Sequence, residues 1–187
     1  MSSQDKRSVP TAGRRIRLSP GRKVAYTALL TALALIFSYV EAIVPVSVGI
    51  PGVKLGIANL VVLVALFTLD FRYAFAVNMI RILVNGLLFT GLFGALYSLA
   101  GGILSLLVMW LLSRTRLFSI VGISMAGGVA HNIGQLLVAS FVISDLRIFS
   151  YLPVLMFSGI ISGILIGFLA HYVLKSIRIV FKQEAIS

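Results

Sequence analysis

The sequence predicts an all-α integral membrane protein, a bundle of six transmembrane helices. Three observations predict this fold: the composition, the six apolar segments and the placement of the basic residues. Hydrophobic residues make up 59% of the chain and charged residues only 11%. The mean hydropathy is +1.08. These values lie far from those of ordinary soluble domains, so the bulk of the chain is expected to lie in a lipid bilayer.

The six apolar segments appear in order along the chain. Most reach the roughly 20 residues that a helix needs to cross the hydrocarbon core, the second is short, and the last two are long enough to tilt or to extend beyond it. None alternates between apolar and polar residues, as the strands of a membrane barrel do. The predicted spans are Val24–Val44, Val53–Leu69, Tyr73–Thr90, Leu92–Leu112, Leu117–Ile143 and Ile148–Leu174.

The basic residues determine the predicted orientation. With both termini in the cytoplasm, 13 of the 16 Lys and Arg residues lie on the inner side, while Lys54 and Arg147 lie outside and Arg81 lies within a span. The positive-inside rule therefore selects an N-in, C-in multi-pass protein of the plasma membrane. The net charge of +11 then reflects topology, and no nucleic-acid partner is expected. We divide the chain into a flexible basic cytoplasmic tail (1–23), a six-helix transmembrane domain (24–175) and a short cytoplasmic tail (176–187).

The connection between the first two spans is unusual in its composition. The stretch "VPVSVGIPGVKLGIANLV" holds two prolines and three glycines among apolar residues, and these residues interrupt a regular helix. One interpretation is a re-entrant or extracellular capping loop at Pro45–Gly52, with Glu41 before it and Lys54 after it. Irregular backbone at membrane depth would then have to lie against protein or a wet cavity. The other interpretation is an ordinary extracellular loop.

Polar residues inside the predicted spans mark a candidate ligand site, because each costs free energy unless it is paired or faces water. Asn78, Arg81 and Asn85 recur at spacings of three and four on one helical face of the third span. Counting inward at about 1.5 Å per residue places Arg81 and His131 in adjacent layers of the membrane. The candidate ligand-binding residues are Glu41, Lys54, Asn59, Asn78, Arg81, Asn85, His131, Asn132 and Gln135.

Arg81 is the most informative of these residues. The chain has five acidic residues, and none of them lies near the middle of a predicted span. The guanidinium must therefore find carbonyl groups, water, Glu41 folded inward from the outer end, or a negative group on a ligand. We favour a polar, anionic ligand. The alternative is an arginine satisfied by Asn side chains and backbone carbonyls.

Several kinds of chemistry have no sequence support. The chain lacks a GxxxxGK[ST] loop for nucleotide hydrolysis. It has no cysteine, and its two histidines lie on different spans with no neighbouring acid, so neither a metal site nor a cofactor is predicted.

Small residues recur at four-residue spacing on three spans. Gly159, Gly163 and Gly167 form a ridge on the sixth span, a second ridge lies on the fifth, and Ala28 and Ala32 lie on the first. Such ridges allow close approach of helix backbones. Packing within the chain is the favoured explanation, with docking of another subunit as the alternative. The ridge of the fifth span consists of Gly122, Ala126, Ala130 and Gly134.

The segment "SYVEAIVPVSVGIPGVKLGIANLVVLVALF", from Ser38 to Phe67, resembles the signature of the Gx transporter family, also called the heptaprenyl diphosphate synthase component I family. "PGVKLGIAN" is its most specific part. Members resemble the substrate-binding S components of energy-coupling factor (ECF) transporters. The resemblance implies a six-helix protein that captures a scarce nutrient under an extracellular loop, with a T component and two ATPases as partners. It also implies that Ala28 and Ala32 dock the T component, although Ile36 interrupts the run of small residues.

The enzyme name of this family has no support in the motifs of this chain. Prenyl diphosphate synthases resemble one another in paired DDxxD motifs, whose carboxylates hold Mg²⁺ against the diphosphate. No two acids here lie within ten positions of each other. We therefore expect a non-enzymatic, S-component-like subunit for uptake of a small polar nutrient such as a vitamin or precursor. The alternatives are an accessory membrane subunit of prenyl diphosphate or quinone metabolism, and a scaffold in a membrane redox complex.

Overall fold

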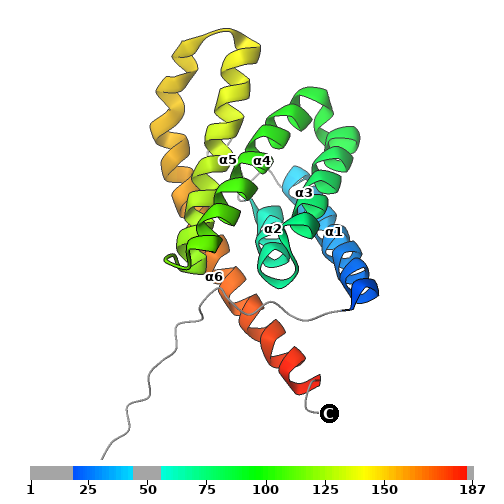
Figure 1. The fold of residues 1–187 in the computed structure, drawn as a ribbon. Helices are drawn as coiled ribbons and strands as arrows, with labels where there is room; N and C mark the ends of the chain where they lie inside the picture. The colour runs from blue at the N-terminus through cyan, green and yellow to red at the C-terminus, as the bar shows by residue number, and fades with distance from the viewer. Residues whose placement is uncertain (1–18, 44–55, 185–187) are drawn as a thin grey trace, which may run out of the picture.

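The computed structural model describes residues 19–43 and 56–184. Within these ranges the chain forms six α-helices, one π-helical turn (η1) and one 3₁₀ helix (η2), and no strand (Figure 1). The helices of the described part are α1 (Pro20–Ile43), α2 (Ile57–Thr68), α3 (Phe71–Asn85), η1 (Gly86–Thr90), α4 (Gly91–Thr115), α5 (Ile120–Ile143), η2 (Leu146–Tyr151) and α6 (Leu152–Glu184).

The predicted all-helical, membrane-type fold is confirmed. Four helical stretches of the described chain are long and apolar enough to cross a membrane: Pro20–Glu41, Phe71–Thr115, Ile120–Ile143 and Leu146–Val180. The prediction of six spans differs for two reasons. The third and fourth predicted spans belong to one helical stretch of 45 residues, and α2 has only 12 residues, fewer than the roughly 20 that a span requires. The six-span topology, its orientation and the capping loop stay predictions, and Pro45–Gly52 lies outside the described residues.

Capping side chains explain two helix starts that differ from the prediction. Ser119 precedes α5, and its Oγ accepts a hydrogen bond from the Gly122 N–H at 3.1 Å, so the helix begins at Ile120 and not at Leu117. Asp145 starts η2 in the same way, with Oδ1 accepting from the Arg147 N–H at 2.8 Å. The 3₁₀ helix η2 therefore occupies the start of the sixth predicted span.

Left-handed residues and a π-helical turn define the other boundaries. α2 begins after Gly56, whose φ is +71°, a conformation that glycine adopts without steric cost. Gly91, with φ +69°, follows the π-helical turn η1 between α3 and α4. At the other end of the chain α6 continues to Glu184, so its last turns occupy most of the segment expected to be a short tail.

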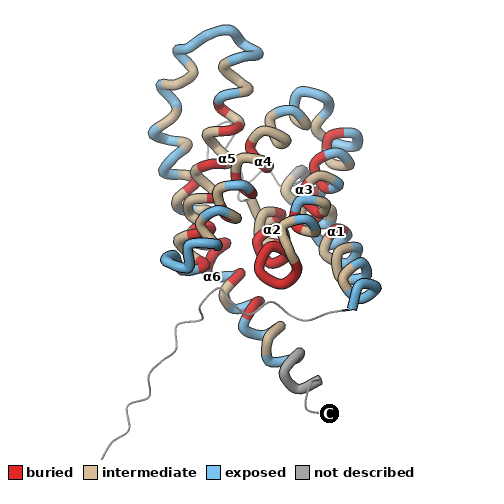
Figure 2. Tube along the Cα trace, in the orientation of Figure 1, coloured by how far each residue is buried: buried red, intermediate tan, exposed pale blue. Residues whose placement is uncertain are grey.

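The short helix α2 lies at the centre of the core. Every residue from Val61 to Thr68 is buried, and Figure 2 shows this helix as the most continuously buried one. A helix that is apolar on all sides is expected to be surrounded by other helices. Its side chains belong to one hydrophobic core with Ala34 of α1, Val77 of α3, Ile123 of α5 and Ile166 of α6. α2 is thus a buried helix that packs against α1, α3, α4 and α6.

Glycines bring α5 and α6 into backbone contact. A Cβ on Gly163 would lie 2.6 Å from the Met125 Cα, and one on Gly167 would lie 2.7 Å from the Val121 Cα. The predicted ridge of the sixth span therefore packs inside the chain. The predicted ridge of the fifth span is not its partner, because Gly134 instead faces α4, where a Cβ would lie 2.7 Å from the Ala100 carbonyl oxygen.

Gly163→Ala is predicted to destabilise the helix bundle. The added Cβ would overlap the α5 backbone, and such overpacking costs about 1–3 kcal/mol. Gly21→Ala is the matched control, because a Cβ there meets nothing within 4 Å and alanine favours a helix by up to about 1 kcal/mol over glycine. Unfolding by SDS titration from a mild detergent would measure both. Equal midpoints for Gly163→Ala and the parent protein would contradict the packing described here.

Candidate functional site

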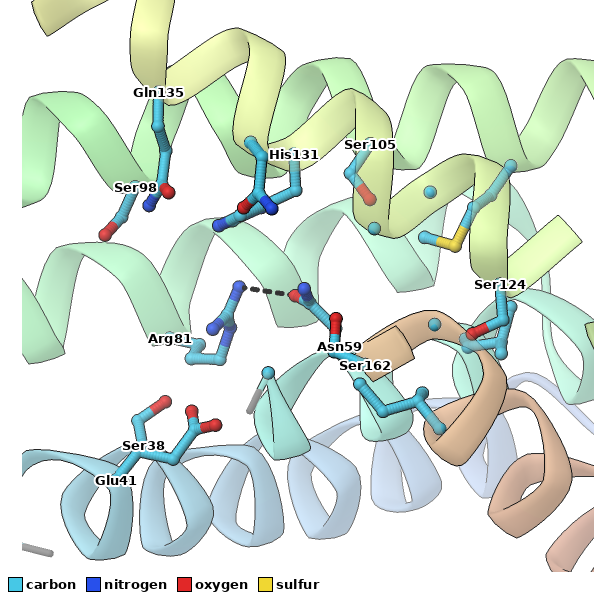
Figure 3. Close-up of a pocket in the computed structure, with 18 of the residues that line it drawn as sticks. Ser38, Glu41, Asn59, Arg81, Ser98, Ser105, Ser124, His131, Gln135 and Ser162 are labelled. Atoms are coloured by element: carbon cyan, nitrogen blue, oxygen red, sulfur yellow. Dashed lines mark hydrogen bonds between the residues drawn. The ribbon is translucent and has the colours of Figure 1, made fainter. Parts of the chain in front are cut away.

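A polar cavity of about 290 Å³ lies among the helices. All six α-helices and η1 contribute to its wall. Figure 3 shows Ser38 and Glu41 rising from one side of the cavity, His131 and Gln135 on the opposite side, and Arg81 and Asn59 between them. We call this space the polar cavity.

Arg81 is the cationic centre of the polar cavity. It is only 9% exposed, and its Nη2 donates to Asn78 Oδ1 at 2.8 Å. The same atom donates to Asn59 Oδ1 at 3.3 Å (Figure 3). Its Nε is buried and has no hydrogen-bond partner in the described part of the chain. The guanidinium offers five N–H donors in a fixed plane. The two asparagines therefore satisfy this arginine only in part.

Glu41 joins the end of α1 to the start of α2. Its Oε1 accepts a hydrogen bond from the Ile57 N–H at 2.7 Å, which satisfies one of the free N–H groups at the beginning of α2 and places a negative charge at the positive end of that helix. Glu41 also interacts electrostatically with Arg81. One turn earlier, the Ser38 hydroxyl is buried without a partner among the described residues. This side of the polar cavity thus holds one carboxylate and one unused hydroxyl.

The opposite wall depends on close contact between α4 and α5. A Cβ on Gly101 would lie 2.7 Å from the His131 carbonyl oxygen and 3.0 Å from Gln135 Cγ. Glycine at this position therefore leaves room for the backbone of His131 and the side chain of Gln135. Asn132 has a structural contact as well, because its Nδ2 donates to the Leu155 carbonyl oxygen at 2.6 Å and so links α5 to α6.

The structure brings together six of the nine residues predicted for the site. Asn78 lies behind Arg81 as its hydrogen-bond acceptor, and it does not line the cavity. Asn85, the last residue of α3, does not line it either. Lys54 lies outside the described residues. The six that line the polar cavity are Glu41, Asn59, Arg81, His131, Asn132 and Gln135.

Sequence reasoning missed the serines of the polar cavity. Serine is common in membrane helices, where its hydroxyl can bond to a carbonyl of the preceding turn, so a lone serine says little. A signal was present on α4, where Ser98 and Ser105 lie seven residues apart on one face and flank Gly101. The serines that line the cavity are Ser38, Ser98, Ser105, Ser124 and Ser162.

This arrangement suits recognition of a polar or anionic group. A partly satisfied guanidinium, hydroxyls and amides can donate to a carboxylate or phosphate. Within residues 19–43 and 56–184, no group of three His, Cys, Asp or Glu side chains is placed to hold a metal ion.

Glu41→Ala is predicted to lower stability by about 1 kcal/mol, because the Ile57 N–H loses its acceptor. Glu41→Gln is the matched control, since the amide oxygen can still accept that hydrogen bond while the charge is removed. Thermal unfolding in detergent would measure both variants. If Glu41→Gln loses as much stability as Glu41→Ala, the charge beside Arg81 and the α2 helix end, and not the cap, is the stabilising feature.

Comparison with known protein families gives one result that covers most of the chain. Residues 30–173 match the family described as heptaprenyl diphosphate synthase component I. This range runs from α1 into α6 and contains Arg81 and every other residue that lines the polar cavity. No curated protein and no solved structure matches the chain. The family match covers more than half of the 187 residues, so the chain belongs to the heptaprenyl diphosphate synthase component I family.

Proposed function

We propose that this protein is a substrate-binding membrane subunit that holds a small polar, anionic ligand in the polar cavity. The observation that carries the proposal is Arg81, a buried cation that its asparagine neighbours satisfy only in part. A charge inside a helix bundle costs several kcal/mol unless partners compensate it. A ligand carboxylate or phosphate would supply the remaining acceptors.

The lining of the polar cavity supports a ligand more than a purely structural arginine. Ser38 is 5% exposed, lines the cavity, and has an Oγ that no described residue contacts by a hydrogen bond. Hydroxyl groups and amides on several helices converge on one space beside Arg81 (Figure 3). An arginine needed only for packing would not require this surplus of polar groups. Convergent polar groups in a cavity are typical of ligand sites.

We further propose that the bound ligand is taken up in the manner of an ECF S component, powered by a separate T component and ATPases. The chain has no phosphate-binding loop of its own, so energy would come from partners. Ala28 and Ala32 are exposed on α1 and offer a flat surface for a partner helix. Ile36, at the next position of this face, is 57% exposed. The loop expected to cover the cavity would be Pro45–Gly52.

The second candidate is an accessory membrane subunit of prenyl diphosphate or quinone metabolism. The family description, which names one component of a synthase, favours it. In this case the partner would be a synthase subunit, and Arg81 would meet the head group of the prenyl compound. A scaffold in a membrane redox complex is the remaining alternative.

Arg81→Ala is predicted to abolish ligand binding while the protein stays folded in detergent. Arg81→Lys keeps the charge but loses the planar fork, so it should bind the ligand more weakly than the parent protein. Arg72→Ala is the matched control, because Arg72 lies on the same helix and is exposed. Native mass spectrometry of protein purified gently from its own host would measure the co-purified ligand. Full ligand occupancy in Arg81→Ala would remove Arg81 from the site.

The same measurement separates the candidate functions. A water-soluble metabolite together with a T component would support the uptake subunit. A prenyl diphosphate or quinone together with a synthase or redox subunit would support the alternatives.

The double variant Ala28→Leu/Ala32→Leu is predicted to prevent uptake without affecting ligand binding. The larger side chains would hold a partner helix away from α1. Leu33→Phe is the control, because it adds bulk at another exposed position of α1. Uptake by whole cells of the ligand identified by mass spectrometry would be compared with its retention on the purified variants. Normal uptake by the double variant would rule out docking at this face.

A further inference from the structure

A second cavity of about 430 Å³ adjoins the polar cavity. It lies between the first turns of α4, the second half of α5 and the segment from η2 into α6. We call it the apolar cavity, because its described lining contains no charged side chain and is formed largely by aliphatic and aromatic groups. These include Tyr97, Leu136, Ala139, Ile148, Tyr151 and Leu155.

Two residues belong to the walls of both cavities. Ser98 of α4 and Gln135 of α5 each line the polar and the apolar cavity. They come from facing helices, and Figure 3 shows their side chains next to each other. Ser98 and Gln135 therefore form the boundary between the two cavities, and a ligand beside Arg81 would extend past them to occupy both.

The charges are divided sharply between the two spaces. Arg81 and Glu41 both line the polar cavity, whereas the apolar cavity has no charged group on its described wall. The polar cavity alone is at the lower limit of the roughly 300–1,000 Å³ of common ligand pockets, and the two cavities together lie well within that range. Such a division suits a molecule with one charged end and one apolar end.

We infer that the ligand is an amphiphile whose anionic head is held at Arg81 and whose apolar chain lies in the apolar cavity. The inference rests on the proposed function, because it assumes that the polar cavity binds a ligand, and it specifies the chemical class of that ligand. The occupant of the apolar cavity is then part of the same molecule as the head. A separate lipid acyl chain in the apolar cavity is the competing occupant.

A homologous series of alkyl phosphates, from methyl to hexyl phosphate, tests the inference. Binding to the full chain in lipid nanodiscs would be measured by titration calorimetry. The affinity should rise about fourfold for each CH₂ group buried in the apolar cavity. Arg81→Ala should lose binding of the whole series.

A variant that fills the apolar cavity separates specific burial from partition into the bilayer. Ala139→Trp should keep the parent affinity for methyl phosphate and lose the gain with chain length. Its matched control is Leu137→Trp, at a position on the same helix that is 50% exposed and does not line the apolar cavity. This control should keep the gain. If Ala139→Trp no longer binds methyl phosphate, the smaller Ala139→Leu replaces it and should reduce the gain.

The outcomes distinguish the inference from the function on which it rests. Arg81-dependent binding of methyl phosphate, with no gain for longer chains or with a gain that survives filling of the apolar cavity, would overturn the inference and leave the proposed function in place. If no member of the series binds in an Arg81-dependent manner, the anionic-ligand site itself fails.

Discussion

The structure depends on the accommodation of one buried guanidinium. Arg81 lies in a bundle whose other interior residues are overwhelmingly apolar, and the free energy cost of this charge must be offset locally. Asn78 accepts from it within α3, and Asn59 accepts from it across to α2. Because Asn59 lies in the first turn of α2, the position of this helix along the bundle is tied to the depth of Arg81. Glu41 adds a second contact at the start of the same helix, where it accepts from the Ile57 N–H.

The short length of α2 and the polar cavity both follow from the way this helix is buried among the others. α2 is buried from Val61 to Thr68, so it packs against protein along this length and need not match the thickness of a bilayer. Its start at Ile57 leaves space between the other helices, and the polar cavity reaches Gly56 and Asn59 at this end. The close backbone contact of α5 with α6 at Gly163 holds the opposite wall in place, which allows a cavity to persist in a closely packed interior.

The sequence predicted the long apolar helices better than the helix boundaries and cavity residues that depend on single residues. Long apolar runs predicted the helices, and the spacing of Arg81 and His131 placed both side chains at one cavity. The same spacing also placed Asn85 at the cavity, and the structure shows that it does not line it. The start of α2 depends on the left-handed φ of Gly56, which sequence permits but does not require. The hydroxyl of a serine such as Ser105 can be satisfied within its own helix, so its type alone does not predict a site.

Glu41 would connect the binding of an anionic ligand to the contact between α1 and α2. Its carboxylate accepts a hydrogen bond from the Ile57 N–H and also interacts electrostatically with Arg81. In the absence of a ligand it therefore supplies the negative charge that a ligand head would supply. An anionic head at Arg81 would place two negative groups beside one cation, and like charges at short range repel. Glu41 would then be driven toward the start of α2 or away from the cavity. Under the proposed function, the contact between Glu41 and the start of α2 would thus depend on the charge of the ligand.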